Sequence, residues 1–276
     1  MKAPKTPKTP VNAARMREWI EEFAGYRVTV NEGRIDRWLK QFQTRDRDIA
    51  ARVLDVVEFV SKEQIAVAFR QALKRIPKWS ADPKRRKGRW RFVPFTASAG
   101  ESGDTMLHEF RIANGMAKRE FNELFVYKSD LPGEQLGPSD TVVFVDDFSG
   151  TGVQAIDHWE VKLKQLLPQS PSVYLVVVLA GVRAVQEIGK QTGLVVIANG
   201  LVRHGDNIFH QDCRHFSKRE KAVILRYCER AKPDEPRGYG DSGLVVVFPH
   251  RCPNNSIPIL HNSRKEWGEG LFRRSD

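Results

Sequence analysis

With 276 residues, 41% of them hydrophobic, the chain is long enough to bury a sizeable core in one large domain or in a core domain with a smaller attachment. It has no apolar run that could span a membrane, no secretory signal after its basic start, and three scattered cysteines without a CxxC pair, so we expect a cytoplasmic protein with no membrane contact and no disulfide framework. The net charge of +11 comes from the first third, since residues 1–95 hold 23 Lys and Arg against 11 Asp and Glu, whereas the remainder holds 22 against 23.

The start of the chain is predicted to be mainly helical. Residues 1–10 alternate Lys, Thr and Pro, so we expect a disordered basic tail there. Residues 11–80 repeat apolar side chains at helical spacing in four segments, which predicts a helical N-terminal domain. Asn31 is placed to cap the second helix, the third helix is expected over about 46–60, and a capping-box spacing at 61–64 opens the fourth.

A basic linker is expected over residues 81–91. It contains the run KRRKGRWR, which mixes cations with Trp90. Such a segment can neutralise phosphates and release counterions, which is the main source of non-specific affinity for nucleic acid. A solubilising surface is the alternative. The residues that would contact nucleic acid are Lys84, Arg85, Arg86, Lys87, Arg89 and Arg91.

Residues 92–276 change to short β-rich runs that alternate with helical ones. This alternation, with nearly continuous apolar strands, predicts an α/β domain built on a parallel sheet. Ligands bind such sheets beyond the carboxyl ends of their strands. Strands are expected at 92–97, 124–127, 141–147, 173–181, 194–199 and 244–248, and helices near 105–116, 153–166, 183–191 and after a capping box at 217–220.

The stretch TVVFVDDFSGTGVQ, residues 141–154, has the composition of a ligand site at such a strand end. An apolar run leads into Asp146 and Asp147, whose carboxylates suit the vicinal hydroxyls of a ribose if the backbone turns there so that both line one crevice. Two glycines in the following loop, 149–152, let backbone N–H groups approach a ligand closely. With a helix starting near Val153, these amides would cradle a phosphate.

The acidic pair also fits three structures that bind no ribose phosphate. A Walker B strand ends in two acids, but the sequence has no GxxxxGK[ST] loop. Response-regulator receivers place their acidic pair early in the domain and need an acceptor Asp on a later strand, and neither 173–181 nor 194–199 ends in one. A charged strand tip with a tight turn is the third alternative, and it stays open.

The stretch VVFVDDFSGTGVQ resembles the 5-phosphoribosyl-1-pyrophosphate (PRPP) signature of type I phosphoribosyltransferases, with a departure at Gln154, where the family often has Thr. The resemblance implies that Asp146 and Asp147 hold the ribose hydroxyls and act in catalysis. It also implies that PRPP binds with Mg²⁺ and that the protein makes no direct bond to the metal. The 5-phosphate would be held by Ser149, Gly150, Thr151 and Gly152.

A wider resemblance covers most of residues 90–260. Together with FVDDFSGTG, the stretch GYGDSGLVVVFPHRCPNNSIPIL, 238–260, is similar to the phosphoribosyltransferase-like family of bacterial conflict systems, which include retron-type and other anti-phage loci. This resemblance implies an effector of antiviral defence. Its partners would be nucleic acid or a reverse-transcriptase–ncDNA complex, docked on the basic N-terminal third. Composition indicates nothing of the kind.

Two further segments match places where the family binds pyrophosphate. Lys128 follows the expected strand 124–127, where family enzymes often present a cation. The connection 128–140 matches the mobile catalytic loop in position, although it is short for that loop. An ordinary loop and a solvated lysine are the alternatives. The other segment is the loop SAGESGD, 98–104, whose candidate residues are Ser98, Gly100, Ser102 and Gly103.

The acceptor of a ribosyl group would meet residues from two later loops. The stretch RHGDNIFHQDCRH, 203–215, offers Arg203 and His204, and the spacing of its His, Asp and Cys residues matches no zinc pattern, so no direct metal site is expected. The stretch GYGDSG, 238–243, offers Tyr239 and Asp241. In both places a polar loop or a tight turn is the alternative.

Two functions therefore remain open. The first is a glycosyltransferase, or an enzyme that consumes PRPP or nucleotides, whose oxocarbenium-like transition state depends on positioning and charge stabilisation. The second is a regulatory module that senses PRPP or a nucleotide without catalysis. The residues decide neither the acceptor nor the oligomeric state, for which a homo-oligomer stays open.

Overall fold

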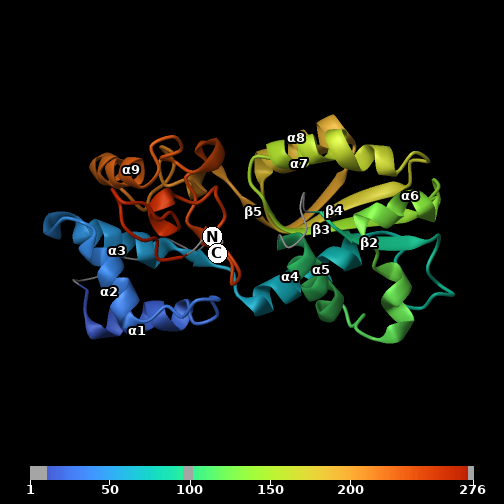
Figure 1. Cartoon of the computed structure of the whole chain (residues 1–276), viewed down its shortest axis with the longest axis horizontal. Coiled ribbons are helices and arrows are strands. Elements are labelled where there is room, and N and C mark those ends of the chain that lie inside the picture. The colour runs from blue at the N-terminus through green and yellow to red at the C-terminus, as the bar shows by residue number, and fades with distance from the viewer. Residues whose placement is uncertain (1–10, 96–101, 273–276) are drawn as a thin grey trace. The chain divides into compact units, whose positions relative to one another are not determined.

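The computed structural model describes residues 11–95 and 102–272, which form two compact units (Figure 1). We call residues 63–202 the sheet unit, because they hold the larger sheet. Residues 11–62 and 203–272 form the terminal unit, which is built from the two ends of the chain. No helix in these described ranges is long and apolar enough to cross a membrane.

Four parallel strands form the sheet of the sheet unit, which confirms the predicted α/β class. Their spatial order is β2-β3-β4-β5, so strands that follow one another in the sequence are neighbours in the sheet. Residues 142–145 of β3 are 0% exposed, because the strand has a partner on each side and helices on each face. The strands are β2 (Trp90–Pro94), β3 (Thr141–Ser149), β4 (Ser172–Gly181) and β5 (Val195–Val202).

Helices cover both faces of this sheet (Figure 1). On one face, Phe110 of α5 packs against Phe69 of α4 and Phe92 of β2, with ring centroids 5.5 and 5.1 Å apart. On the other face, α7, α8 and the π-helical turn Trp159–Leu163 share an apolar core with β3 and β4. The helices are α4 (Lys62–Arg75), α5 (Ser102–Ala113), α6 (Leu131–Glu134), α7 (Val153–His158) and α8 (Val182–Thr192).

The strand expected at 124–127 is wrong. A 3-10 helix, Arg119–Leu124, extends into the segment, and within it only Phe125 forms a bridge, to Phe92 of β2. The two rings lie 5.3 Å apart, so Phe125 is a half-buried side chain that packs at the edge of the sheet. A short apolar run satisfies a strand pattern and a packed loop equally well.

The terminal unit joins the first helices of the chain to its C-terminal segments. Two of the predicted caps are confirmed, since the side chain of Asn31 accepts the N–H of Arg34 and the side chain of Ser217 accepts the N–H of Glu220. The elements are α1 (Ala13–Glu22), α2 (Glu32–Lys40), α3 (Arg47–Val56), α9 (Lys218–Ala231), β1 (Glu58–Phe59) and β6 (Val246–Val247).

The strands β1 and β6 pair in parallel and form a separate two-stranded sheet. The helix expected over 46–60 therefore ends at Val56, because the residues after it pair with β6. The strand expected at 244–248 pairs with β1 and is not part of the four-stranded sheet. Pairing partners far away in the sequence decide the state of such short runs.

Aromatic side chains from both ends of the chain build the core of the terminal unit. Phe42 packs against Tyr227 and Trp267, with ring centroids 4.6 and 5.1 Å apart. Phe23 packs against Phe272 at 5.0 Å. These contacts make the unit discontinuous in sequence.

The boundaries of the units differ from those expected from composition. The chain divides after residues 62 and 202, whereas the composition pattern placed a helical domain over 11–80, a linker over 81–91 and an α/β domain over 92–276. Composition changes along the chain record local propensity, and they contain no information on the long-range aromatic packing described above. Independent folding of the expected segments stays a prediction.

A buried ion pair links α1 to α3 in the terminal unit. The guanidinium of Arg15 donates from Nη2 to Asp55 Oδ2 over 2.7 Å and from Nε to Oδ1 over 3.2 Å. The indole N–H of Trp19 donates to the same Oδ1 over 3.0 Å. Arg15 and Asp55 are 3% and 4% exposed, so removal of either one would leave an unpaired charge buried in the core.

We therefore expect Asp55→Ala to lower the free energy of unfolding by about 3–5 kcal/mol, the usual cost of removing one partner of a buried pair. Urea unfolding followed by tryptophan fluorescence measures it. Asp36→Ala is the matched control, because Asp36 forms an exposed pair with Lys40 on α2 and its removal is expected to change the free energy by less than about 0.5 kcal/mol. Equal effects of the two substitutions would contradict the assignment.

Candidate functional site

The acidic pair lies near the carboxyl end of β3, inside the strand and not at its tip. The strand continues to Ser149, and it keeps its register with β4 across the pair, with Asp146 opposite Val177 and Phe148 opposite Leu179. The expectation that the strand ends at the two acids was therefore wrong. Because successive side chains of a strand point to opposite faces, the two carboxylates are directed apart.

The two carboxylates differ in exposure and surroundings. Asp147 is 0% exposed, whereas Asp146 is half-buried. Asp146 Oδ1 accepts the hydroxyl of Ser102 over 3.0 Å and the backbone N–H of Asp147 over 2.9 Å. In this conformation Asp146 is the acid that a ligand can reach from solvent.

The loop after β3 is packed closely against the start of α8. Gly152 has φ +84°, a left-handed conformation that suits glycine, and a methyl group there would come within 3.2 Å of the Cα of Ala184. A methyl group at Gly181, the last residue of β4, would overlap the carbonyl oxygen of Gly150. The two glycine contacts hold the loop 149–152 on the first turn of α8.

The remaining residues of this loop are accessible. Ser149, Gly150 and Thr151 are half-buried, and the hydroxyl of Thr151 accepts the N–H of Val153 at the long distance of 3.4 Å. The structure thus brings the predicted phosphate-binding residues to the end of the strand that carries Asp146. Their action on a phosphate stays a prediction.

Of the four residues predicted in the pyrophosphate loop, Ser98 and Gly100 lie outside the described residues. Ser102 and Gly103 are buried in the first turn of α5. The hydroxyl of Ser102 reaches Asp146, so the structure joins this segment to the carboxylate that was predicted separately.

Lys128 is half-buried and begins a short 3-10 helix, Lys128–Asp130, that continues into α6. Leu131 and Leu136, which lie in the connection 128–140, are 1% and 3% exposed in the core of the sheet unit. This connection was expected to match a mobile catalytic loop in position. The structure instead packs it against the apolar core.

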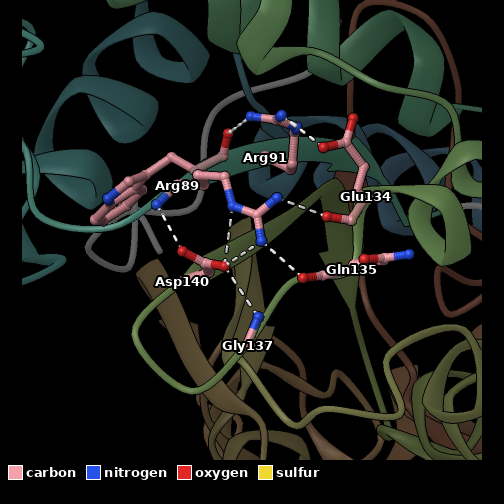
Figure 2. A network of polar contacts seen from close by, with 7 residues as sticks. Arg89, Arg91, Glu134, Gln135, Gly137 and Asp140 are labelled. Atoms are coloured by element: carbon pink, nitrogen blue, oxygen red, sulfur yellow. Dashed lines mark hydrogen bonds and ion pairs between the residues drawn. The ribbon is translucent and has the colours of Figure 1, made fainter.

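Arg89 fastens the same connection to the start of β2 (Figure 2). Its guanidinium donates to the carbonyl oxygens of Glu134 and Gln135, both over 2.7 Å, and to Asp140 Oδ2 over 2.9 Å from Nη2. Asp140 also accepts the N–H groups of Arg89 and Gly137. Burial raises the pKa of the Asp140 carboxyl, but these hydrogen bonds outweigh burial and hold its pKa below the ordinary value.

Two residues of the basic run are thus engaged within the sheet unit. Arg89 is held as described, and Arg91 donates to Glu134 Oε2 over 2.6 Å (Figure 2). Arg86 lies over the ring of Trp79 at 5.4 Å. Lys84, Arg85 and Lys87 are exposed, so they are the residues of the predicted nucleic-acid contact that the surface presents most openly.

The predicted acceptor residues all lie in the terminal unit. Asn207, which follows Arg203 and His204, donates from its side chain to the carbonyl oxygen of Asp241 over 2.8 Å. The backbone also joins the two loops, since the N–H of Ile208 donates to the carbonyl oxygen of Gly243. The structure therefore brings the segments 203–207 and 239–243 together, as residues that serve one ligand would need.

Across residues 11–95 and 102–272, no group of three or more His, Cys, Asp and Glu side chains is arranged to hold a metal ion. The imidazoles of His204 and His210 stack with centroids 5.3 Å apart.

Two features of the site were missed by the sequence pattern. Gly181 ends the neighbouring strand and, having no side chain, leaves space for the carbonyl oxygen of Gly150. The hydroxyl of Ser102 donates a hydrogen bond to Asp146. A glycine at the carboxyl end of the next strand was a usable signal for the first feature, since small residues there permit close approach of a loop. The second required the placement of α5 beside β3.

Comparison with known proteins gives a family match and several distant structural likenesses, including the two that follow. A model of the PRTase-CE family matches residues 35–274. Orotate phosphoribosyltransferase from Aeropyrum pernix is 14% identical with a TM-score of 0.30, over 49% of this chain and 69% of that one. The AQ2163 protein from Aquifex aeolicus is 16% identical with a TM-score of 0.33, over 62% and 83%. Both scores are too low to bear on the fold. No curated protein matches the chain.

The packing of the loop 149–152 on α8 predicts a difference between two glycines of the same region. Gly181→Ala is expected to lower the free energy of unfolding by about 1–3 kcal/mol, because the methyl group would displace the Gly150 carbonyl. In Gly189→Ala, inside α8, the methyl group would have ordinary contact with the Leu194 carbonyl, so no loss and a gain of up to about 1 kcal/mol is expected from helix propensity. Chemical denaturation compares them, and a neutral Gly181→Ala would contradict the close contact.

Proposed function

The chain belongs to the PRTase-CE family, phosphoribosyltransferases of conflict systems, and from this premise we propose that the sheet unit binds PRPP or a related ribose phosphate at the carboxyl end of β3. The observation that carries the proposal is that Asp146 lies near the carboxyl end of β3 and the loop 149–152 follows directly from the same strand. A carboxylate that can accept ribose hydroxyls precedes, by three residues, a loop whose backbone can approach a phosphate.

In this proposal each group of residues has a separate task. Asp146 accepts hydrogen bonds from the vicinal hydroxyls of the ribose, and Asp147 joins it if the strand end opens. The N–H groups and hydroxyls of Ser149, Gly150, Thr151 and Gly152 donate to the 5-phosphate. Lys128 supplies positive charge to the pyrophosphate. The ribose would then be held through its hydroxyls and through its 5-phosphate, which fixes the position of the reacting carbon. Such positioning lowers the entropic part of the barrier.

Mg²⁺ would accompany the ligand and neutralise the pyrophosphate as it leaves. The carboxylate of Asp146 would suit the water molecules that this ion usually keeps, without a direct bond to the ion itself. The bond that breaks is the one between carbon 1 of the ribose and the pyrophosphate oxygen, and the electron pair leaves with that oxygen. The acceptor then forms the new bond to carbon 1 and releases its proton. Arg203, His204, Tyr239 and Asp241 stay the predicted acceptor residues, and all four belong to the terminal unit.

We propose that the protein acts as a defence effector that transfers a glycosyl group or consumes PRPP or a nucleotide. A second candidate is a module that senses PRPP or a nucleotide without catalysis. The complete burial of Asp147 favours this second candidate, because a carboxylate that is 0% exposed makes no contact with a ribose unless the strand end rearranges.

Docking on nucleic acid, or on a reverse-transcriptase–ncDNA complex, is the proposed role of the exposed cations. Lys84, Arg85 and Lys87 lie between α4 and β2. Lys78 is also exposed, and its carbonyl oxygen accepts the N–H of Lys87, which places the two residues side by side. Such a group of exposed cations suits a phosphodiester backbone and gives no base specificity.

Calorimetric titration of PRPP with Mg²⁺ tests the proposed site. We expect saturable binding to the wild type and about a tenfold or greater loss for Asp146→Asn, since a charged acceptor of hydroxyl protons becomes neutral. Asp157→Asn, an exposed acid on α7, is the control and is expected to bind as the wild type does.

Equal heats for Asp146→Asn and the wild type would reject the site. If Asp146→Asn does bind more weakly, release of pyrophosphate from PRPP by the wild type, and not by Asp146→Asn, would identify an enzyme. Binding without release, in the presence of candidate acceptors, would favour the sensor.

The nucleic-acid proposal predicts binding whose affinity falls steeply with salt. Replacing Lys84, Arg85 and Lys87 with Gln should weaken binding of a fluorescent single-stranded oligonucleotide by about tenfold or more at low salt and reduce the salt slope, because fewer counterions are released.

Lys118, Lys162 and Lys190, replaced with Gln, provide a control of equal charge, since all three are exposed in the sheet unit. An equal loss in the control would show an effect of net charge only. Affinity that does not change with salt would reject the proposal.

A further inference from the structure

We propose that Ser102 is a positioning residue for Asp146 and not a ligand of the pyrophosphate. The inference rests on the proposed function of the sheet unit. Ser102 is 7% exposed, and its hydroxyl donates to Asp146 Oδ1 over 3.0 Å. A serine hydroxyl has a single proton. It can donate to the carboxylate or to a phosphate oxygen, and here the carboxylate receives it.

Two donors from different elements meet on the same carboxylate oxygen. The N–H of Asp147 donates to Asp146 Oδ1 over 2.9 Å, and this donor belongs to the strand itself. The Ser102 hydroxyl comes from α5, which is 44 residues away in the sequence. A donor from a separate element fixes the side-chain torsion of Asp146 more firmly than a donor on the adjacent residue does, because it does not move with the same backbone bond.

The helix that carries Ser102 is anchored by buried side chains. Further along α5, Met106 and Phe110 are 1% and 0% exposed, and Phe110 packs on Phe92 of β2. The first turn of the helix is therefore placed by the same core that places β3. Site residues held by packed elements keep their geometry better than residues held by loops.

The two roles for Ser102 predict different dependence on the ligand. If its hydroxyl contacts pyrophosphate, Ser102→Ala weakens the binding of PRPP and leaves ribose 5-phosphate unaffected, because that ligand lacks the pyrophosphate. If the hydroxyl orients Asp146 for the ribose, Ser102→Ala weakens both ligands by the same factor.

Calorimetric titrations with ribose 5-phosphate and with PRPP, both with Mg²⁺, separate the two. We expect Ser102→Ala to weaken both ligands by about tenfold, as the loss of a hydrogen bond to a charged group does. Ser102→Thr retains the hydroxyl and is expected to stay within about threefold of the wild type. Weakening of PRPP alone would overturn the proposal, and so would wild-type affinity of Ser102→Ala for both ligands.

A double-mutant cycle on unfolding tests the same contact without any ligand. Ser102→Ala and Asp146→Ala are expected to be non-additive, with a coupling of about tenfold in the unfolding equilibrium constant, whereas Ser129→Ala, an exposed serine of the same unit, should be additive with Asp146→Ala. Additivity of the first pair would overturn the positioning role. Failure of the wild type to bind either ligand would reject the proposed function instead, and the cycle would still decide whether Ser102 orients Asp146.

Discussion

Carboxylates that lie beside the buried part of β3 lose contact with water, so the protein has to supply hydrogen-bond donors for them. Its residues 142–145 are 0% exposed between two strands and two layers of helices, and the acids of this region, Asp140, Asp146 and Asp147, flank that apolar run. At the amino end, Arg89 and two backbone N–H groups satisfy Asp140 (Figure 2). At the carboxyl end, a hydroxyl and an N–H group orient the half-buried Asp146. One constraint therefore yields a structural clamp at one end of the strand and a candidate ligand site at the other.

The neighbouring strand limits what the loop after β3 can be. The carbonyl oxygen of Gly150 occupies space that a side chain at Gly181 would fill, and Gly152 lies against the backbone of Ala184. The loop 149–152 is thus shaped by the first turn of α8 as well as by its own small residues. A phosphate cradle built in this way depends on the pairing of β3 with β4, because a change in their register would move Gly181 away from Gly150.

Local patterns in the sequence were sufficient where the physics is local. The strands of the four-stranded sheet, the cap at Asn31 and the capping box at Ser217 follow from periodicity and from side chains that bond to nearby backbone, and all are confirmed. The α/β class followed from the alternation of strands and helices, and the family from the resemblance of FVDDFSGTG together with residues 238–260. What the local pattern missed was decided at long range: β6 converts the residues after Val56 into a strand, and Phe42 packs against Tyr227 from the other end of the chain. The bond from Ser102 to Asp146 belongs to the same class, since it depends on how α5 packs.

The same reasoning changes where a polyanion would bind. The basic excess of the first third suggested docking on that third through a linker over residues 81–91, yet the run from Lys84 to Arg91 belongs to the sheet unit. Arg89 and Arg91 are held by Asp140 and Glu134, so their charge is largely neutralised within that unit. The exposed cations that remain precede β2, the strand beside β3. A nucleic acid held there and a ribose phosphate held by Asp146 would therefore bind the same compact body.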